Sequence, residues 1–172
     1  LRQYDLQPRG FILFHPGASQ PGKILPEAGI IAMARHAGKP LAAIGDGETP
    51  LPVPSIIDLR GKIPLSELPW VMSLSSGIIS SDSGPMHLAR AVDIPVAGIF
   101  LQTDPCLGFS PIPGPRVKVI SRPLGCKPCS LHGRRSVCPE KTWACRDLSW
   151  DEIAADIAAF FAPRESSFFA TS

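Results

Sequence analysis

The chain has 172 residues, of which 44% are hydrophobic and 19% are charged, and its formal net charge at pH 7 is +2. This length and composition predict one globular domain with a buried core, and the small net charge gives no reason to expect nucleic acid as a partner. No apolar run approaches the roughly 20 residues of a membrane-spanning helix, so we expect no membrane span.

The first half of the chain alternates between strand and helix patterns. The expected elements are strands at 11–17, 40–47 and 55–61 and helices at 26–38 and 64–77. The helix at 26–38 begins at a proline and ends at a glycine, which are ordinary start and stop signals. In the helix at 64–77, Pro69 predicts a break or a late start, because proline is not tolerated in a helix interior.

The second half repeats this alternation. The expected elements are strands at 77–84, 95–100 and 116–121 and helices at 85–93 and 149–162. Ser149 and Glu152 match a capping box at the start of the last helix. Short strands that alternate with helices predict an α/β fold, a Rossmann-like parallel sheet with helices on both faces. We expect this domain to span 1–163 and 164–172 to form a tail.

The stretch SSDSGPMHLARA, at 80–91, joins a predicted strand to a predicted helix. Ligands of open α/β sheets bind at the carboxyl ends of the strands, and a helix N-terminus offers free N–H groups and a partial positive charge to phosphate. Gly84 would let a ligand approach the backbone, and His87 would reach the same place. A capped turn, with Asp82 or Ser83 as the cap, explains the same residues. From these residues alone both interpretations stay open.

Continued to residue 100, this stretch resembles the signature of glycosyltransferase family 9, the lipopolysaccharide heptosyltransferases. That signature reads Asp-[Ser/Thr]-Gly-x-x-His-Leu-x-x-Ala and precedes a Pro-Val strand. Three other segments resemble family motifs in the family's order: HPGASQPGKILP at 15–26, IIDLRGKIPLSEL at 56–68 and TDP at 103–105. UDP-N-acetylglucosamine 2-epimerases share the Ser-Asp-Ser-Gly turn but continue with a second glycine, where this chain has Pro85.

The resemblance, which covers about 11–162, implies the C-terminal, donor-binding half of a GT-B fold, and hence a piece of a longer protein. The implied activity is inverting transfer from an ADP-sugar, ADP-heptose being the expected donor, to a lipopolysaccharide-core or similar glycan or lipid-linked acceptor. The acceptor site and general base would lie in the other domain, so the isolated chain is expected to be inactive. No cofactor is expected for catalysis. The implied location is the cytoplasm, with peripheral association of the full-length enzyme at the inner face of the bacterial inner membrane.

The resemblance also implies a donor-binding set of seven residues: Lys23, Glu48, Ile63, Asp82, Ser83, Gly84 and His87. Lys23 would neutralise phosphate, Glu48 would hydrogen-bond the nucleoside, and Ile63 would pack against adenine. A solvated lysine, an exposed loop carboxylate and an ordinary apolar contact are the competing interpretations of these three. The chain departs from the family pattern at Leu101-Gln102, where the family has Gly-Pro, and at Leu25-Pro26, where it has Trp-Pro.

Four of the five cysteines lie close together in the sequence: Cys126, Cys129, Cys138 and Cys145. A Cys-x2-Cys pair followed by two more cysteines could hold a structural zinc ion. The basic neighbours Lys127, Arg134, Arg135 and Lys141 are expected to lower the thiol pKa values. Two disulfides, or free thiols that pack in a loop, are the alternatives. The alternative to an enzyme is a non-catalytic, cysteine-rich α/β module that binds a nucleotide or a partner protein.

Overall fold

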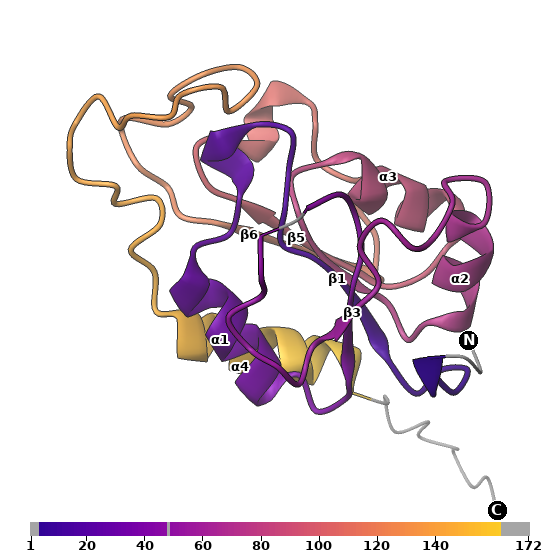
Figure 1. Cartoon of the computed structure of the whole chain (residues 1–172). Helices are drawn as coiled ribbons and strands as arrows, with labels where there is room; N and C mark the ends of the chain where they lie inside the picture. The colour runs from indigo at the N-terminus through magenta and orange to yellow at the C-terminus, as the bar shows by residue number, and fades with distance from the viewer. Residues whose placement is uncertain (1–3, 48, 163–172) are drawn as a thin grey trace, which may run out of the picture.

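The computed structural model describes residues 4–47 and 49–162, and Figure 1 shows them as a sheet flanked by helices. The predicted site residue Glu48, the predicted domain end at 163 and the predicted tail at 164–172 lie outside the described residues. Within the described ranges, no helix combines the length and the apolar character needed to cross a bilayer.

The described residues form one six-stranded parallel sheet with the order β3-β2-β1-β4-β5-β6. Its strands are β1 (Ile12–His15), β2 (Leu41–Ala43), β3 (Ile57–Asp58), β4 (Ile78–Ser81), β5 (Val96–Phe100) and β6 (Val117–Ser121). The central strands are buried along their whole length, as their continuous apolar runs predict. The predicted Rossmann-like parallel sheet is therefore confirmed.

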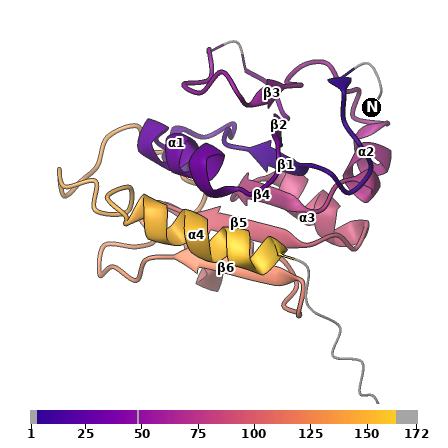
Figure 2. The ribbon, with the colours of Figure 1, turned by 90° about the horizontal axis from the view of Figure 1, so that it is seen from below.

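Helices cover both faces of this sheet (Figure 2). The helices α1 (Glu27–His36) and α4 (Trp150–Phe161) pack against each other on one face, and α2 (Leu68–Leu74) and α3 (Gly84–Ala91) lie on the other. Each face has its own apolar core. Met33, Trp150 and Ile157 belong to the first core, and Met72 and Met86 belong to the second. Short 3-10 turns at Pro21–Lys23 and Pro105–Leu107 follow β1 and β5, respectively.

Several predicted bounds need correction. The strands β1, β2, β3 and β4 are all shorter than predicted. The strand β2 ends before Gly45, whose φ of 107° departs from strand geometry. The helix predicted at 64–77 begins only at Leu68, with Pro69 in its first turn, so the late start is confirmed. The prediction of a capping box at the start of α4 is wrong. Ser149 occupies the N-cap position, but its ψ of 74° is not that of an extended cap and its side chain makes no capping bond.

Candidate functional site

The site lies where the strand order of the sheet reverses. From β1 the chain moves outward through β2 to β3, and it then returns to the other side of β1 to form β4, β5 and β6. The carboxyl ends of β1 and β4 are therefore neighbours at the point where open α/β sheets bind their ligands. The Gly17 loop follows β1 and the turn at 82–84 follows β4, so both open onto this edge.

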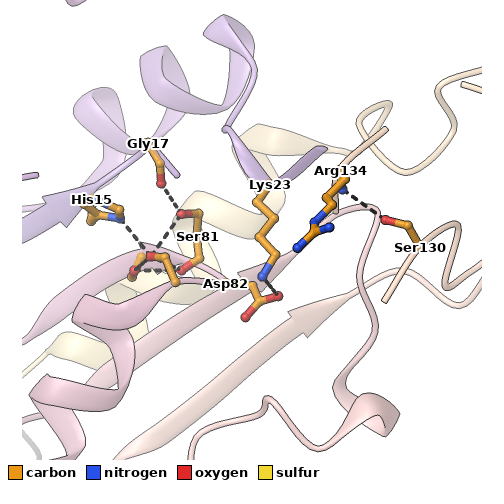
Figure 3. A network of polar contacts seen from close by, with 9 residues as sticks. His15, Gly17, Lys23, Ser81, Asp82, Ser130 and Arg134 are labelled. Carbon is orange, nitrogen blue, oxygen red and sulfur yellow. Dashed lines mark hydrogen bonds and ion pairs between the residues drawn. The ribbon is translucent and has the colours of Figure 1, made fainter. Parts of the chain in front are cut away.

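A hydrogen-bond network ties the two strand ends together (Figure 3). The Ser83 Oγ atom lies 2.9 Å from His15 Nδ1 and donates to the Ser81 carbonyl at 3.1 Å. The Ser81 hydroxyl donates across to the carbonyl of Gly17. Ser83 occupies the N-cap position of α3 but makes no side-chain capping bond, so the cap expected from Asp82 or Ser83 is absent. Its hydroxyl instead joins β4 to β1.

His15 is a site residue that the sequence analysis missed. Burial lowers its pKa to about 4, and the opposing effect of the Asp46 carboxylate is smaller. The imidazole is therefore neutral at pH 7. Gly45 lies against the other side of this ring: a Cβ atom at Gly45 would stand 2.6 Å from His15 Nε2. The signal in the sequence was a polar side chain at the end of an apolar strand, just before Pro16-Gly17.

Lys23 and Asp82 form an ion pair at the same edge, with 2.8 Å between Nζ and Oδ2 (Figure 3). The Lys23 side chain is 15% exposed and that of Asp82 is 3% exposed, so the pair is largely withdrawn from water. Phe109 adds a cation–π contact, with its ring centre 6.0 Å from Nζ. Apart from the Lys23 ammonium, Asp82 Oδ2 has no polar partner among the described residues.

The first turn of α3 is open beside this ion pair. A Cβ atom added at Gly84 would meet no heavy atom within 4 Å, and Gly84 does not have a positive φ. The glycine therefore leaves free space rather than serving an unusual backbone conformation. His87, one turn further on, is exposed. Since no side chain caps the helix, its first N–H groups are available to an anion that approaches over Gly84.

Ile63 lies apart from this turn, in a cavity of about 320 Å³ that reaches the start of α3. His15, Gly45 and Asp46 line one part of it, and Pro85 lines another. The cavity thus connects the predicted apolar contact to the first turn of α3.

A second cavity, of about 420 Å³, shares Asp46 with the first and includes Arg60 in its lining. The Arg60 guanidinium donates from Nη2 to Asp58 Oδ2 at 2.7 Å and from Nε to Oδ1 at 2.8 Å, and these bonds lower the pKa of the Asp58 carboxyl. Arg60 Nη2 also donates to the carbonyl of Thr49, so this guanidinium is already engaged.

The structure therefore brings together four of the seven predicted site residues and places two more nearby, while Glu48 lies outside the described residues. Lys23, Asp82, Ser83 and Gly84 meet at the β1–β4 edge. Ile63 lies near that edge in the lining of the 320 Å³ cavity, and His87 lies near it on α3.

The four clustered cysteines lie in the segment at 126–145, here called the cysteine loop. All five cysteines of the chain are free thiols, and in the part of the chain that the structure describes no three His, Cys, Asp or Glu side chains are grouped to hold a metal ion. The structural zinc expected at Cys126, Cys129, Cys138 and Cys145 stays a prediction.

The expectation that basic neighbours lower the thiol pKa values is wrong for two cysteines. Burial raises the pKa of Cys129 and of Cys145. The pKa of Cys138 is lowered, but mainly by the Trp143 backbone N–H. Lys127 does act to lower the pKa of Cys145, but burial of the thiol outweighs it. The buried ammonium of Lys127 also donates to Ser121 Oγ at 2.8 Å.

Several solved structures resemble the chain over most of its length. Escherichia coli ADP-heptose lipopolysaccharide heptosyltransferase II is 20% identical, with a TM-score of 0.69 over 93% of this chain and 49% of that chain. The iron-containing, dodecameric E. coli heptosyltransferase TibC, in complex with ADP-D-beta-D-heptose, is 19% identical, with a TM-score of 0.67 over 88% and 44%. E. coli heptosyltransferase WaaC with ADP is 17% identical, with a TM-score of 0.63 over 90% and 45%.

At these identities the likeness shows the fold, and the chain spans about half the length of each of these heptosyltransferases. A comparison with curated protein sequences finds no match. The sequence profile of glycosyltransferase family 9 (heptosyltransferase) matches residues 46–143, which include the turn at 82–87 and most of the cysteine loop. Because this match covers more than half of the chain, the chain belongs to glycosyltransferase family 9, the heptosyltransferase family.

Proposed function

We propose that this chain is the donor-binding half of an inverting GT-B glycosyltransferase and that it binds an ADP-sugar, with ADP-heptose as the expected donor. The observation that carries the proposal is the uncapped first turn of α3, which opens over Gly84 next to the Lys23–Asp82 ion pair. A helix N-terminus and a lysine together suit a diphosphate. The solved relatives that contain ADP or an ADP-heptose support the choice of nucleotide.

The nucleoside would occupy the cavity that Ile63 lines, because this cavity reaches Pro85 at the start of α3. Its apolar part would receive the adenine ring, and the neutral imidazole of His15 would offer one ring nitrogen to a polar group of the nucleoside. Glu48 is the proposed partner of the ribose. Asp82 would hold the Lys23 ammonium in place beside the phosphates of the donor.

The chemical role of this chain would be to stabilise the leaving group. As the acceptor oxygen bonds to the anomeric carbon, the bond from that carbon to the β-phosphate oxygen breaks and ADP leaves with the bonding electrons. The N–H groups of α3 and the ammonium of Lys23 would face the charge that develops on the diphosphate. A base from outside this chain would take the acceptor's proton, so the isolated chain should bind donor and transfer nothing.

The acceptor would be a lipopolysaccharide-core or similar glycan, or a lipid-linked sugar, bound mainly by the other half of the enzyme. The enzyme would work in the cytoplasm, at the inner face of the bacterial inner membrane.

Calorimetry of the 172-residue chain with ADP and with UDP tests the proposed function. We expect ADP to bind at least about tenfold more tightly than UDP, which corresponds to about 1.4 kcal/mol. Equal affinities, or tighter binding of UDP, would contradict the assignment of the donor. A protein that binds neither nucleotide would instead fit the non-catalytic alternative. An incubation with ADP-heptose and a core glycan should yield no transfer product from this chain alone.

A further inference from the structure

The cysteine loop is docked on the segment that carries Lys23. The Gly22 N–H donates to the Gly133 carbonyl at 2.9 Å. The Gln102 side chain donates from Nε2 to the Arg135 carbonyl at 2.9 Å, and the Gln102 carbonyl accepts from the Cys129 N–H at 3.1 Å. These bonds join the loop to the residues that follow β1 and β5. Gln102 is one of the positions at which the chain departs from the family pattern, and here it anchors the loop.

The docking brings residues 133 and 134 against the Lys23 side chain. Gly133 has a φ of 71°, and a Cβ atom added to it would stand 2.7 Å from Lys23 Cγ, so the loop backbone touches this lysine directly. Arg134 is the next residue, and its backbone N–H is fixed by Ser130 Oγ at 3.0 Å. Figure 3 shows the Arg134 guanidinium directed toward Lys23 and Asp82.

The charges at this place do not balance. Lys23 and Asp82 neutralise each other across 2.8 Å. The guanidinium of Arg134 donates to no carboxylate among the described residues, since no ion pair or hydrogen bond of its side chain joins it to them. Two cations and one carboxylate therefore face the same space. A guanidinium is well suited to bind two oxygens of a phosphate group at once.

We propose that Arg134 is a further phosphate-binding residue of the donor site, held there by the cysteine loop, and that it contacts the diphosphate of the bound nucleotide. This inference rests on the proposed function and extends it. The ion pair of Lys23 with Asp82 leaves the diphosphate only the helix N-terminus and a partly neutralised lysine, and Arg134 supplies the missing positive charge. The cysteine loop is thereby a positioning element for the site.

Calorimetry with ADP and with adenosine tests this role in the Arg134→Gln and Arg134→Lys variants. We expect Arg134→Gln to weaken ADP binding about 5- to 20-fold, as for the loss of a charged hydrogen bond at a partly hydrated site. Adenosine binding should be unchanged, because adenosine has no phosphate. Arg134→Lys should bind ADP more tightly than Arg134→Gln but less tightly than the wild type. Lysine keeps the positive charge but lacks the planar guanidinium that binds two phosphate oxygens at once.

Arg135→Gln is the matched control, because it removes an exposed positive charge from the neighbouring position, where the guanidinium donates from Nε to the Cys129 carbonyl. The proposal is supported if Arg134→Gln weakens ADP binding more than Arg135→Gln does. It is overturned if Arg134→Gln binds ADP like the wild type, if both variants lose the same affinity, or if adenosine binding falls in parallel. Wild-type protein that binds no ADP would overturn the proposed function, and this role with it.

Discussion

The Lys23 ammonium and the Asp82 carboxylate lie 2.8 Å apart, on segments that follow two neighbouring strands. Asp82 is almost fully buried, and Lys23 is its ion-pair partner among the described residues. We predict that Lys23→Met lowers the free energy of unfolding by about 2–4 kcal/mol, because it leaves a buried carboxylate without a counter-charge. Urea unfolding at pH 7 measures this difference.

The double variant Lys23→Met/Asp82→Asn is the control for this pair. It should recover a large part of the lost stability, because neither charge then remains buried alone. A double variant that is as unstable as Lys23→Met would show that the loss comes from packing of the lysine chain. In either background ADP binding should remain weaker than in the wild type, since both variants lack the ammonium.

Gly84 offers a way to separate ligand binding from stability. Because a Cβ atom there would enter open space and φ is not positive, Gly84→Ala should leave the free energy of unfolding within about 0.5 kcal/mol of the wild type or raise it slightly. The added methyl group should nevertheless weaken ADP binding about tenfold or more, because it occupies the space over the first turn of α3. Calorimetry and urea unfolding of the same sample give both values.

Gly114→Ala is the matched control for Gly84→Ala. A Cβ atom at Gly114 also meets nothing within 4 Å, and this loop residue lies just before β6. It should change neither stability nor ADP affinity. Normal ADP binding by Gly84→Ala would mean that the nucleotide does not approach the helix over this residue.

The general architecture followed from the sequence, but several contacts of the site did not. The apolar runs and their spacing predicted the parallel sheet, and the Asp82–Gly84 turn was placed correctly at a strand end. The pairing of Asp82 with Lys23 and the docking of Gly133 on Gly22 join segments far apart in the chain, and neither spacing nor composition encodes such contacts. The capping bond predicted for Ser149 does not form, because the backbone conformation of the turn, and not the residue type alone, decides whether a side chain can cap the helix.

The buried imidazole of His15 predicts a pH dependence of stability. Its pKa is lowered to about 4 by burial, against an ordinary value of 6.5. Between these values the unfolded chain binds a proton that the folded chain does not bind. The free energy of unfolding should therefore fall as the pH decreases from 6.5 toward 4, by up to about 3 kcal/mol.

The variant His15→Asn removes the titrating group and keeps a polar atom near the position of Nδ1 beside Ser83. We expect urea unfolding of His15→Asn to vary less between pH 6.5 and pH 4.5 than that of the wild type. His87→Asn, which changes an exposed histidine, should keep the wild-type dependence. If His15→Asn retains the full dependence, another group is responsible for it.

The cysteine loop has contacts that do not depend on a cross-link. All five cysteines are free thiols in the structure. Gly22 and Gln102 form hydrogen bonds with backbone groups of the loop, and Arg146, which follows the loop, donates to the Pro21 carbonyl. These bonds hold the segment in place without a cross-link. We therefore predict that protein purified without reductant under anaerobic conditions shows five reactive thiols after denaturation.

Two disulfides would reduce that number to one. A structural zinc ion would leave five thiols in the denatured protein but would add one equivalent of metal in elemental analysis of the native protein. Thiol counting combined with elemental analysis thus separates the three states, and fewer than five thiols or a stoichiometric metal would contradict a loop that is held by hydrogen bonds and packing alone.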